Sequence, residues 1–276
     1  MNRRAFLGSL GAAAYAGMQG VKVIDAHAHL HHHGNPNWSE DDRKLIDAAD
    51  KLGIDQLCCS ILPPERPTRM ESFRDCNRYL AEAIRRFPGR IRGYCFVNPG
   101  YTKEAHDEVR RYVEEHGFVG VKLYNDYRAN EPVVFPIAEL AIELKIPILH
   151  HAGHVSWLPS PQPRISDAGH FAELARRYPE LMLICAHVCG GGDWEWTIKT
   201  LRDAPAVFLD TSGSVADEGV VEMAVRTLGA ERLLFACDMS LTASVGRIRG
   251  ADISDADRKK ILGANMERIL SRRSSR

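Results

Sequence analysis

The sequence lacks the features that mark several common classes of protein. Its seven cysteines are an odd number and include no CxxC pair, which argues against a disulfide framework. Lysine plus arginine and aspartate plus glutamate are balanced at 36 each, so no net charge draws the chain towards nucleic acid or an anionic membrane. No apolar run is long enough to cross a bilayer. We therefore expect a globular protein with no nucleic-acid partner and no membrane-inserted segment.

The first sixteen residues differ in composition from the rest of the chain. Arg3 and Arg4 precede a short, weakly apolar run that ends in Ala14-Tyr15-Ala16. This arrangement resembles a twin-arginine export signal with an A-x-A cleavage site. We expect residues 1–16 to be the signal and residues 17–276 the folded domain, which predicts a periplasmic or exported protein. The alternative is a basic tail on a cytoplasmic protein.

Short apolar segments alternate with amphipathic ones through the remaining chain. The expected strands are residues 21–30, 53–61, 91–97, 119–123, 146–151, 181–187, 206–210 and 232–238. Helices are expected from residue 39 and over residues 72–87, 102–116, 132–145, 167–178, 194–201, 219–228 and 254–270, with capping-box starts at Ser39 and Ser254. Such alternation predicts a parallel sheet with right-handed crossovers. Because no glycine-rich phosphate loop follows the first strand and no linker divides the chain, we expect a single-domain (β/α)8 TIM barrel rather than an open doubly wound sheet.

Residue types that bind metals end several of these strands. His27 and His29 end the first strand and point the same way, because side chains alternate along a strand. His151 ends the fifth strand, His187 the sixth and Asp238 the eighth. The carboxyl ends of all strands in a barrel meet at one rim, where active sites lie. The sequence therefore predicts a metal centre at this rim, whereas a buried and a solvated histidine are the alternative for the first pair alone.

The ordered set of strand-end motifs resembles the amidohydrolase superfamily, and most closely its amidohydrolase-related (type 2) branch. The resemblance covers the chain after residue 20 and is carried by IDAHAHL, IPILHHAGH, LICAHVCGG, RLLFACDMS and ILGANMERIL. It implies that the metal ligands are His27, His29, His151 and Asp238. His151 matches the family position better than His150, which should point to the other face of its strand. His187 matches a histidine that binds a second metal or polarises the substrate.

The resemblance also implies a cofactor of one divalent metal ion. Zinc is the first expectation, and manganese or iron would suit the same ligands. A second ion is an open alternative, held by His187 and Lys122, because some superfamily members carboxylate a lysine at the end of strand four. A substrate contact or a buried amine are the other interpretations of Lys122.

The expected reaction is hydrolysis of an amide, ester or lactone bond in a small molecule by a metal-activated water. Asp238 would then act as the general base and His187 would polarise the scissile carbonyl. The alternative is a metal-dependent non-oxidative decarboxylase or hydratase of a small, possibly aromatic, carboxylic acid, since the same branch contains such enzymes with nearly the same metal site. A catalytically silent metal-binding barrel is the third hypothesis.

Residues in the loops after the strands would select the substrate. Arg128 is expected to clamp a carboxylate, with a solvated loop charge as the alternative. Trp157, Tyr124 and Trp194 either line a pocket for a ring substrate or cover the barrel mouth. Barrels of this family often form dimers, so a homodimer is a further hypothesis that no sequence feature decides.

Overall fold

The computed structural model describes residues 20–31, 37–153, 164–188, 193–215 and 217–273 of the chain. Residues 1–16 lie outside these ranges, so the export signal stays a prediction. Within the described ranges, no helix is both long and apolar enough to cross a membrane.

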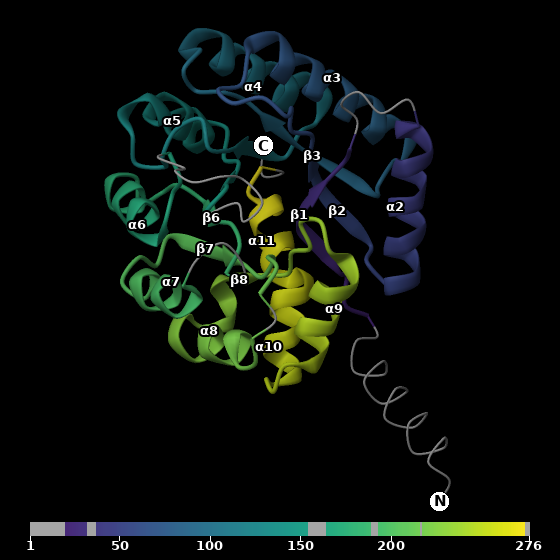
Figure 1. Ribbon diagram of the computed structural model, residues 1–276, viewed down its shortest axis with the longest axis vertical. Helices are drawn as coiled ribbons and strands as arrows, with labels where there is room; N and C mark the ends of the chain where they lie inside the picture. Colours follow the sequence, from purple (N-terminus) through teal and green to yellow (C-terminus); the bar gives the residue numbers. More distant parts are fainter. Residues whose placement is uncertain (1–19, 32–36, 154–163, 189–192, 216, 274–276) are drawn as a thin grey trace, which may run out of the picture.

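Eight parallel strands form one sheet in sequential order, from β1 to β8. They are β1 (Ile24–His29), β2 (Gln56–Ser60), β3 (Ile91–Phe96), β4 (Gly120–Leu123), β5 (Ile148–His150), β6 (Leu183–Cys185), β7 (Val207–Asp210) and β8 (Leu233–Leu234). The sheet closes between its first and last strands, where Ala26 N donates to Phe235 O at 2.8 Å and Ala28 bridges to Asp238. The fold is therefore the expected single-domain (β/α)8 barrel (Figure 1).

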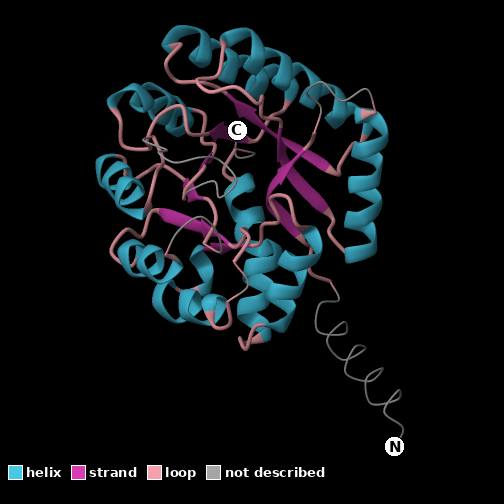
Figure 2. Cartoon of the chain, viewed as in Figure 1, coloured by secondary structure: helices cyan, strands magenta, loops and turns pink. Residues whose placement is uncertain are grey.

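Helices surround the strands on the outside of the barrel (Figure 2). They are α2 (Trp38–Leu52), α3 (Met70–Arg86), α4 (Thr102–His116), α5 (Phe135–Glu143, after a 3-10 turn at Pro132–Val134), α6 (Ala168–Arg177), α7 (Trp194–Leu201), α8 (Val220–Leu228), α9 (Leu241–Gly250), α10 (Asp255–Lys259) and α11 (Asn265–Ser271). A 3-10 turn at Ala230–Arg232 precedes β8, and a π-helical segment at Lys260–Ala264 joins α10 to α11.

Strand side chains divide between two apolar clusters. One cluster fills the barrel interior and includes Ile24, Tyr94, Leu149 and Leu234. The other, larger cluster lies between the strands and the helices. This division is the expected result of alternation along strands that are covered on both faces. It fixes which strand-end residues can reach the barrel mouth.

The last segment of the chain packs tightly against the start of the barrel. A Cβ atom on Gly263 would lie 1.8 Å from the carbonyl oxygen of Lys22, so only glycine fits the π-helical segment at this position. Asn265 donates from Nδ2 to the carbonyl oxygens of Ala230 (2.7 Å) and Leu233 (2.8 Å). The ILGANMERIL motif therefore anchors the C-terminal helices to β8.

Three local predictions differ from the structure. The first helix begins at Trp38 after the N-cap residue Asn37, whose side chain makes no capping hydrogen bond, so the capping box at Ser39 is wrong. Residues 254–270 form α10, the π segment and α11 instead of one helix, although the Ser254 side chain does cap α10 through Asp257 N. Helix α9 was not expected, because two glycines and a buried serine interrupt its apolar pattern.

Candidate metal centre

The two histidines of β1 reach the barrel mouth because the strand contains an irregularity. Ile24 and Ala26 belong to the interior cluster, so simple alternation would also turn Ala28 inwards. The register of β1 against β2 shifts between Asp25 and Ala28, and Ala28 packs in the outer cluster instead. This bulge turns His27 and His29 inwards.

The two histidines and Asp238 form one tight group. Nε2 of His27 lies 3.1 Å from Nε2 of His29, and Asp238 Oδ1 lies 3.2 Å from the latter and 3.9 Å from the former. All three offer a ligand atom within 4.8 Å of one another. The side chain of Asp238 is 27% exposed, against 0% for His27 and 8% for His29, so it is the group of the three most open to the mouth.

Hydrogen bonds on the far side of each imidazole show which nitrogen carries the hydrogen. Nδ1 of His29 lies 3.2 Å from the carbonyl oxygen of Ser60, which can only accept, and 3.1 Å from the hydroxyl oxygen of the same serine, which can accept as well. Nδ1 of His27 lies 2.8 Å from Asp210 Oδ2. Both Nε2 atoms are therefore lone pairs that face each other and a carboxylate oxygen. Three acceptors at these distances repel one another unless a cation lies among them. The Lys122 ammonium contacts His27 Nε2 at 2.8 Å but, among the side chains that the structure describes, forms no hydrogen bond or ion pair with His29 or the carboxylate oxygen, so the donor set as a whole fits a divalent metal.

His151 lies beside this group rather than within it. Its Nδ1 is 3.0 Å from Nε2 of His187, and its own Nε2 is buried without a hydrogen-bond partner in the described part of the chain. His150 faces the other way, as alternation predicts, and packs edge-on against Phe171 of α6. His151 thus presents a free lone pair or hydrogen to the barrel mouth, and His150 does not.

His187 reaches the mouth through a left-handed backbone conformation. Its φ is 67°, and its backbone N–H donates to Asp210 Oδ1 at 2.9 Å. Burial lowers the pKa of the imidazole, so the ring is neutral near pH 7. Nδ1 lies 2.8 Å from Oγ of Ser212, which leaves the ring between that serine and His151.

Lys122 is buried, and its three interpretations, a metal-bridging carboxylated lysine, a substrate contact and a buried amine, stay predictions. It lies inside the barrel with 0% exposure, and Nζ donates to Nε2 of His27 at 2.8 Å. Burial lowers the pKa of the lysine to about 8. Its positive charge therefore faces the nitrogen that would bind a metal.

Asp210, at the end of β7, was not among the residues singled out from the sequence. It is fully buried, and burial opposes its ionisation. Hydrogen bonds donated by His27 and Ser212 nevertheless hold the pKa of Asp210 below its usual range. The strand-end rule that selected Asp238 would have found it, because the AVFLD segment ends in this aspartate.

The residues expected to select the substrate are dispersed. Arg128 is exposed, and its backbone N–H donates to Glu131 at 2.8 Å. Trp157 lies outside the described residues, and Trp194 donates from Nε1 to Asp217 at 2.8 Å. Only Tyr124 meets the centre, with its ring centroid 4.3 Å from that of His151.

A different arginine lies over Tyr124. The guanidinium carbon of Arg66 is 4.5 Å from the centroid of the Tyr124 ring and 5.7 Å from that of Phe96. Arg66 follows β2 and is half-buried, and its Nε is buried without a hydrogen-bond partner among the described residues. No strand-end pattern in the sequence singles out this loop residue.

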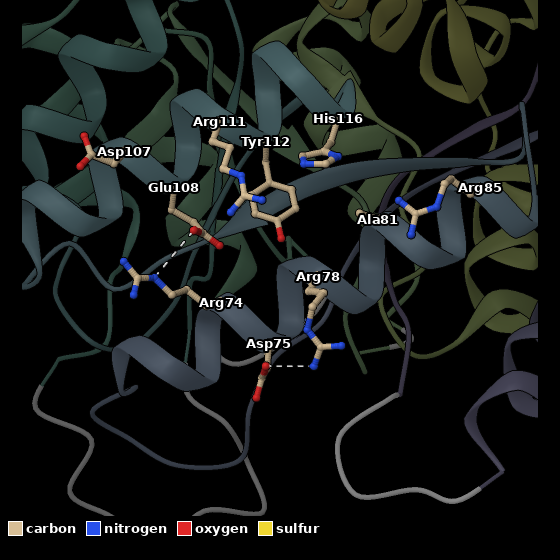
Figure 3. Close-up of a pocket in the computed structure, with 10 residues that line it drawn as sticks. All are labelled: Arg74, Asp75, Arg78, Ala81, Arg85, Asp107, Glu108, Arg111, Tyr112 and His116. Atoms are coloured by element: carbon tan, nitrogen blue, oxygen red, sulfur yellow. Dashed lines mark hydrogen bonds and ion pairs between the residues drawn. The ribbon is translucent and has the colours of Figure 1, made fainter.

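A charged cavity on the outside of the barrel is separate from this centre (Figure 3). It lies between α3 and α4 and encloses about 530 Å³. Arg74 pairs with Glu108 at 3.9 Å and Arg78 with Asp75 at 3.0 Å across its wall. Its cations are thus largely neutralised by neighbouring carboxylates, and none of its lining residues comes from a strand end.

The sequence and the fold of this chain are similar to those of known proteins. The amidohydrolase family model matches residues 24–272. A γ-resorcylate decarboxylase of Polaromonas sp. strain JS666 is 25% identical over 85% of this chain and 90% of its own length. A dihydroxybenzoic acid decarboxylase structure from the same organism, with bound manganese and the inhibitor 2-nitroresorcinol, has a TM-score of 0.71, 21% identity and coverage of 91% of this chain and 97% of its own.

A third similar protein is a 5-carboxyvanillate decarboxylase of Novosphingobium aromaticivorans. Its manganese complex has a TM-score of 0.72 and 16% identity, and the match covers 92% of this chain and 97% of that one. All three similar proteins are named as decarboxylases, which break a carbon–carbon bond. The expectation of a hydrolase acting on C–N or C–O bonds is therefore wrong, because the relatives match the alternative instead.

Proposed function

The chain belongs to the amidohydrolase family, an enzyme superfamily built on metal-dependent barrels, and from this premise we propose that it is a non-oxidative decarboxylase of a small phenolic carboxylic acid. The observation that carries the proposal is the similarity to a γ-resorcylate decarboxylase over most of both chains. It coincides with a group of histidines and a carboxylate suited to one divalent metal. Manganese is the first ion to test instead of zinc, since it is the ion in the similar decarboxylase structures.

We assign the metal ligands to His27, His29, Asp238 and, through its unpartnered Nε2, His151. When bound, a divalent ion supplies a Lewis acid that neutralises carboxylate and phenolate oxygens of a substrate. His187 receives a positioning role rather than a catalytic one, because the protein occupies both of its ring nitrogens, Nδ1 with Ser212 and Nε2 with His151. A second metal ion would need these same atoms, so one ion is the favoured stoichiometry.

Asp238 is the residue we assign to the proton transfers. Burial opposes the ionisation of Asp238, but the surrounding histidines, His29 above all, hold its pKa below its usual range, so the resting group is a base. It takes the phenolic proton of an ortho-hydroxybenzoate and returns it to the ring carbon that bears the carboxylate. The electrons of the broken carbon–carbon bond then restore the aromatic ring. The hydroxybenzoate anion gives one phenolate anion and one carbon dioxide, which balances atoms and charge.

Arg66 is the residue we assign to anion recognition in place of Arg128. Its guanidinium lies over Tyr124, which in turn stacks on His151, whereas Arg128 is exposed. Burial lowers the pKa of Arg66, yet an arginine remains charged at neutral pH. Nη1 of Arg66 already donates to the carbonyl oxygen of Pro63 and to Thr68 Oγ1, so the edge formed by Nε and Nη2 is the one suited to bidentate binding of a carboxylate.

The test is turnover of 2,6-dihydroxybenzoate by the purified protein loaded with manganese. We expect resorcinol and carbon dioxide in equal amounts, and no reaction after the metal has been removed with a chelator. An amide, an ester and a lactone of similar size serve as matched substrates. Hydrolysis of any of these, with no carbon dioxide from hydroxybenzoates including 5-carboxyvanillate, would overturn the proposal.

Export and self-association remain proposals of the same kind. Cleavage after Ala16 would be detected by N-terminal sequencing of protein from the periplasm of an expressing bacterium. Light scattering on the purified protein would detect a homodimer. A full-length cytoplasmic monomer would contradict both.

A further inference from the structure

Asp210 collects four hydrogen bonds at the end of β7. Oδ2 faces Nδ1 of His27 at 2.8 Å. Oδ1 accepts from the backbone N–H groups of His187 and Ser212, both at 2.9 Å, and from Oγ of Ser212 at 2.6 Å. Asp210 and Ser212 have 0% exposure, so no solvent competes for these atoms. One carboxylate is thereby connected to histidines from two different strands.

The donors and acceptors in this network admit one arrangement of hydrogens. Three donors converge on Oδ1 of Asp210, and Lys122 Nζ faces Nε2 of His27, which leaves the hydrogen of that ring on Nδ1, facing Oδ2. Asp210 is therefore an ionised acceptor, and the single hydrogen of the Ser212 hydroxyl lies between Oγ and Oδ1. Oγ can then only accept from His187, so Nδ1 of His187 carries its hydrogen at 2.8 Å. Nε2 of the neutral His187 ring is left as a lone pair.

The same reasoning extends one step further, to His151. Because Nε2 of His187 is a lone pair, Nδ1 of His151 must donate to it across 3.0 Å. The hydrogen on Nδ1 leaves Nε2 of His151 bare, and this is the buried atom with no partner in the described residues. His27 has the same tautomer, with its hydrogen on Nδ1, because that nitrogen donates directly to Asp210 Oδ2.

We propose that Asp210 and Ser212 are positioning residues that hold His27, His187 and His151 as Nδ1–H tautomers, so that Nε2 of His27 and of His151 point to the metal as lone pairs. The proposal deepens the site on which the proposed function rests. It concerns the metal-free protein, however, and does not require the reaction to be a decarboxylation. A carboxylate that orients a metal-binding histidine is known to tune metal affinity by 10–100-fold.

The loop that carries Ser212 is held by the helix that the sequence did not predict. Arg247 of α9 donates to the carbonyl oxygens of Thr211 (2.7 Å), Gly213 (2.9 Å) and Val215 (2.9 Å). Three bonds from one guanidinium fix the backbone on both sides of Ser212. The serine hydroxyl is therefore positioned by a contact that is independent of the histidines.

The experiment is ¹⁵N NMR of the histidine rings in metal-free, full-length protein, with assignment by single histidine-to-glutamine variants. The wild type should show Nδ1–H tautomers for His27, His187 and His151. In Asp210→Asn, the amide oxygen will take the place of Oδ1, where three donors converge, and its NH₂ will face His27. His27 would then face a donor at each ring nitrogen, the amide at Nδ1 and Lys122 Nζ at Nε2, so the ¹⁵N signal of its Nδ1 should shift and manganese binding should weaken by about 10–100-fold.

Ser212→Ala should have the complementary effect. Without the hydroxyl, His187 and His151 should become mixtures of tautomers, whereas His27 should keep its hydrogen on Nδ1. Asp42→Asn, at a buried carboxylate of α2 that pairs with Arg86, is the control and should change none of the three rings. An Nε2–H tautomer for His27 or His187 in the wild type would overturn the proposal, as would unchanged spectra in both site variants. If Asp210→Asn does not fold, the wild-type and Ser212→Ala spectra still test the proposed tautomers and the role of Ser212.

Discussion

Lys122 Nζ lies 2.8 Å from Nε2 of His27, and both side chains are fully buried inside the barrel. At this distance an N–H group of Lys122 points at Nε2 of His27, the nitrogen that we assign to the metal. Two interpretations of Lys122 then make opposite predictions. As an ammonium it repels a divalent ion, whereas as a carboxylated lysine it would bind one.

We expect Lys122→Met to bind manganese about tenfold or more tightly than the wild type, because a neighbouring positive charge is removed from a poorly solvated site. The measurement is a competition titration of the metal-free protein against a chelator. Lys103→Met, at an exposed helix position, is the matched control and should leave the affinity unchanged. Weaker binding in Lys122→Met would favour a carboxylated, bridging lysine instead.

Arg66→Met should raise the KM for 2,6-dihydroxybenzoate by about tenfold or more, because a charge-assisted contact with the carboxylate is lost. The inhibition constant of resorcinol, which has no carboxylate, should change much less. Arg128→Met removes an exposed arginine from the same rim and should leave both constants near those of the wild type. Equal losses for both ligands in Arg66→Met would indicate a structural effect on Tyr124 rather than anion recognition.

Asp238→Asn should fold normally and lower kcat for decarboxylation by about 10³-fold, since the proton transfers lose their base. The measurement pairs steady-state kinetics with metal analysis, because Asp238 also belongs to the ligand group. Activity should stay low even at manganese concentrations that fill the site. Retained turnover in the metal-loaded variant would remove Asp238 from the proton transfers.

The metal-free protein should lose stability as the pH falls below the ordinary pKa of histidine. Burial lowers the pKa of His27 to about 3 and of His150 to about 4, and it also lowers those of His151 and His187. Histidines of the unfolded chain bind protons near pH 6.5, whereas the buried histidines of the folded protein stay neutral until a lower pH. Their contribution to stability is therefore fully present above pH 6.5 and is lost as the pH falls towards their folded pKa values. Between about pH 7.5 and about pH 5.5 the loss is about 1 kcal/mol each for His27 and His150, and His151 and His187 act in the same direction.

Buried carboxyl groups act against this loss, because burial raises the pKa of Asp42, Glu108 and Asp126 as well as that of Asp25. Burial raises the pKa of Asp25 to about 7, so the folded protein gains a proton over part of the same range. We expect the four buried histidines to outweigh these carboxyl groups, so that the net effect is a loss of unfolding free energy on acidification. Urea denaturation of metal-free protein at several pH values measures it, and His150→Gln should reduce the slope without touching the metal centre. Stability that rises towards pH 5.5 would contradict the neutral state of these rings.

Sequence reasoning succeeded where one local rule is enough. The period of two along β5 separates His151 from His150. The alternation of strands and helices predicts a barrel, and a barrel brings the strand ends to one rim. It erred at α9, where contacts made by Arg247 with a distant loop stabilise a helix whose own apolar pattern is weak.

The sequence by itself determined the barrel and the residue types at its mouth, because both follow from periodicity along the chain. Only the tertiary structure decided how those residues meet. A bulge in β1 and a left-handed His187 set the direction of three imidazoles, and neither has a distinctive local pattern. The hydrogen bond between His27 and Asp210 joins residues 183 positions apart. Which ring nitrogen of His27 carries the hydrogen depends on this distance across the barrel, and the spacing of residues along one strand does not predict it.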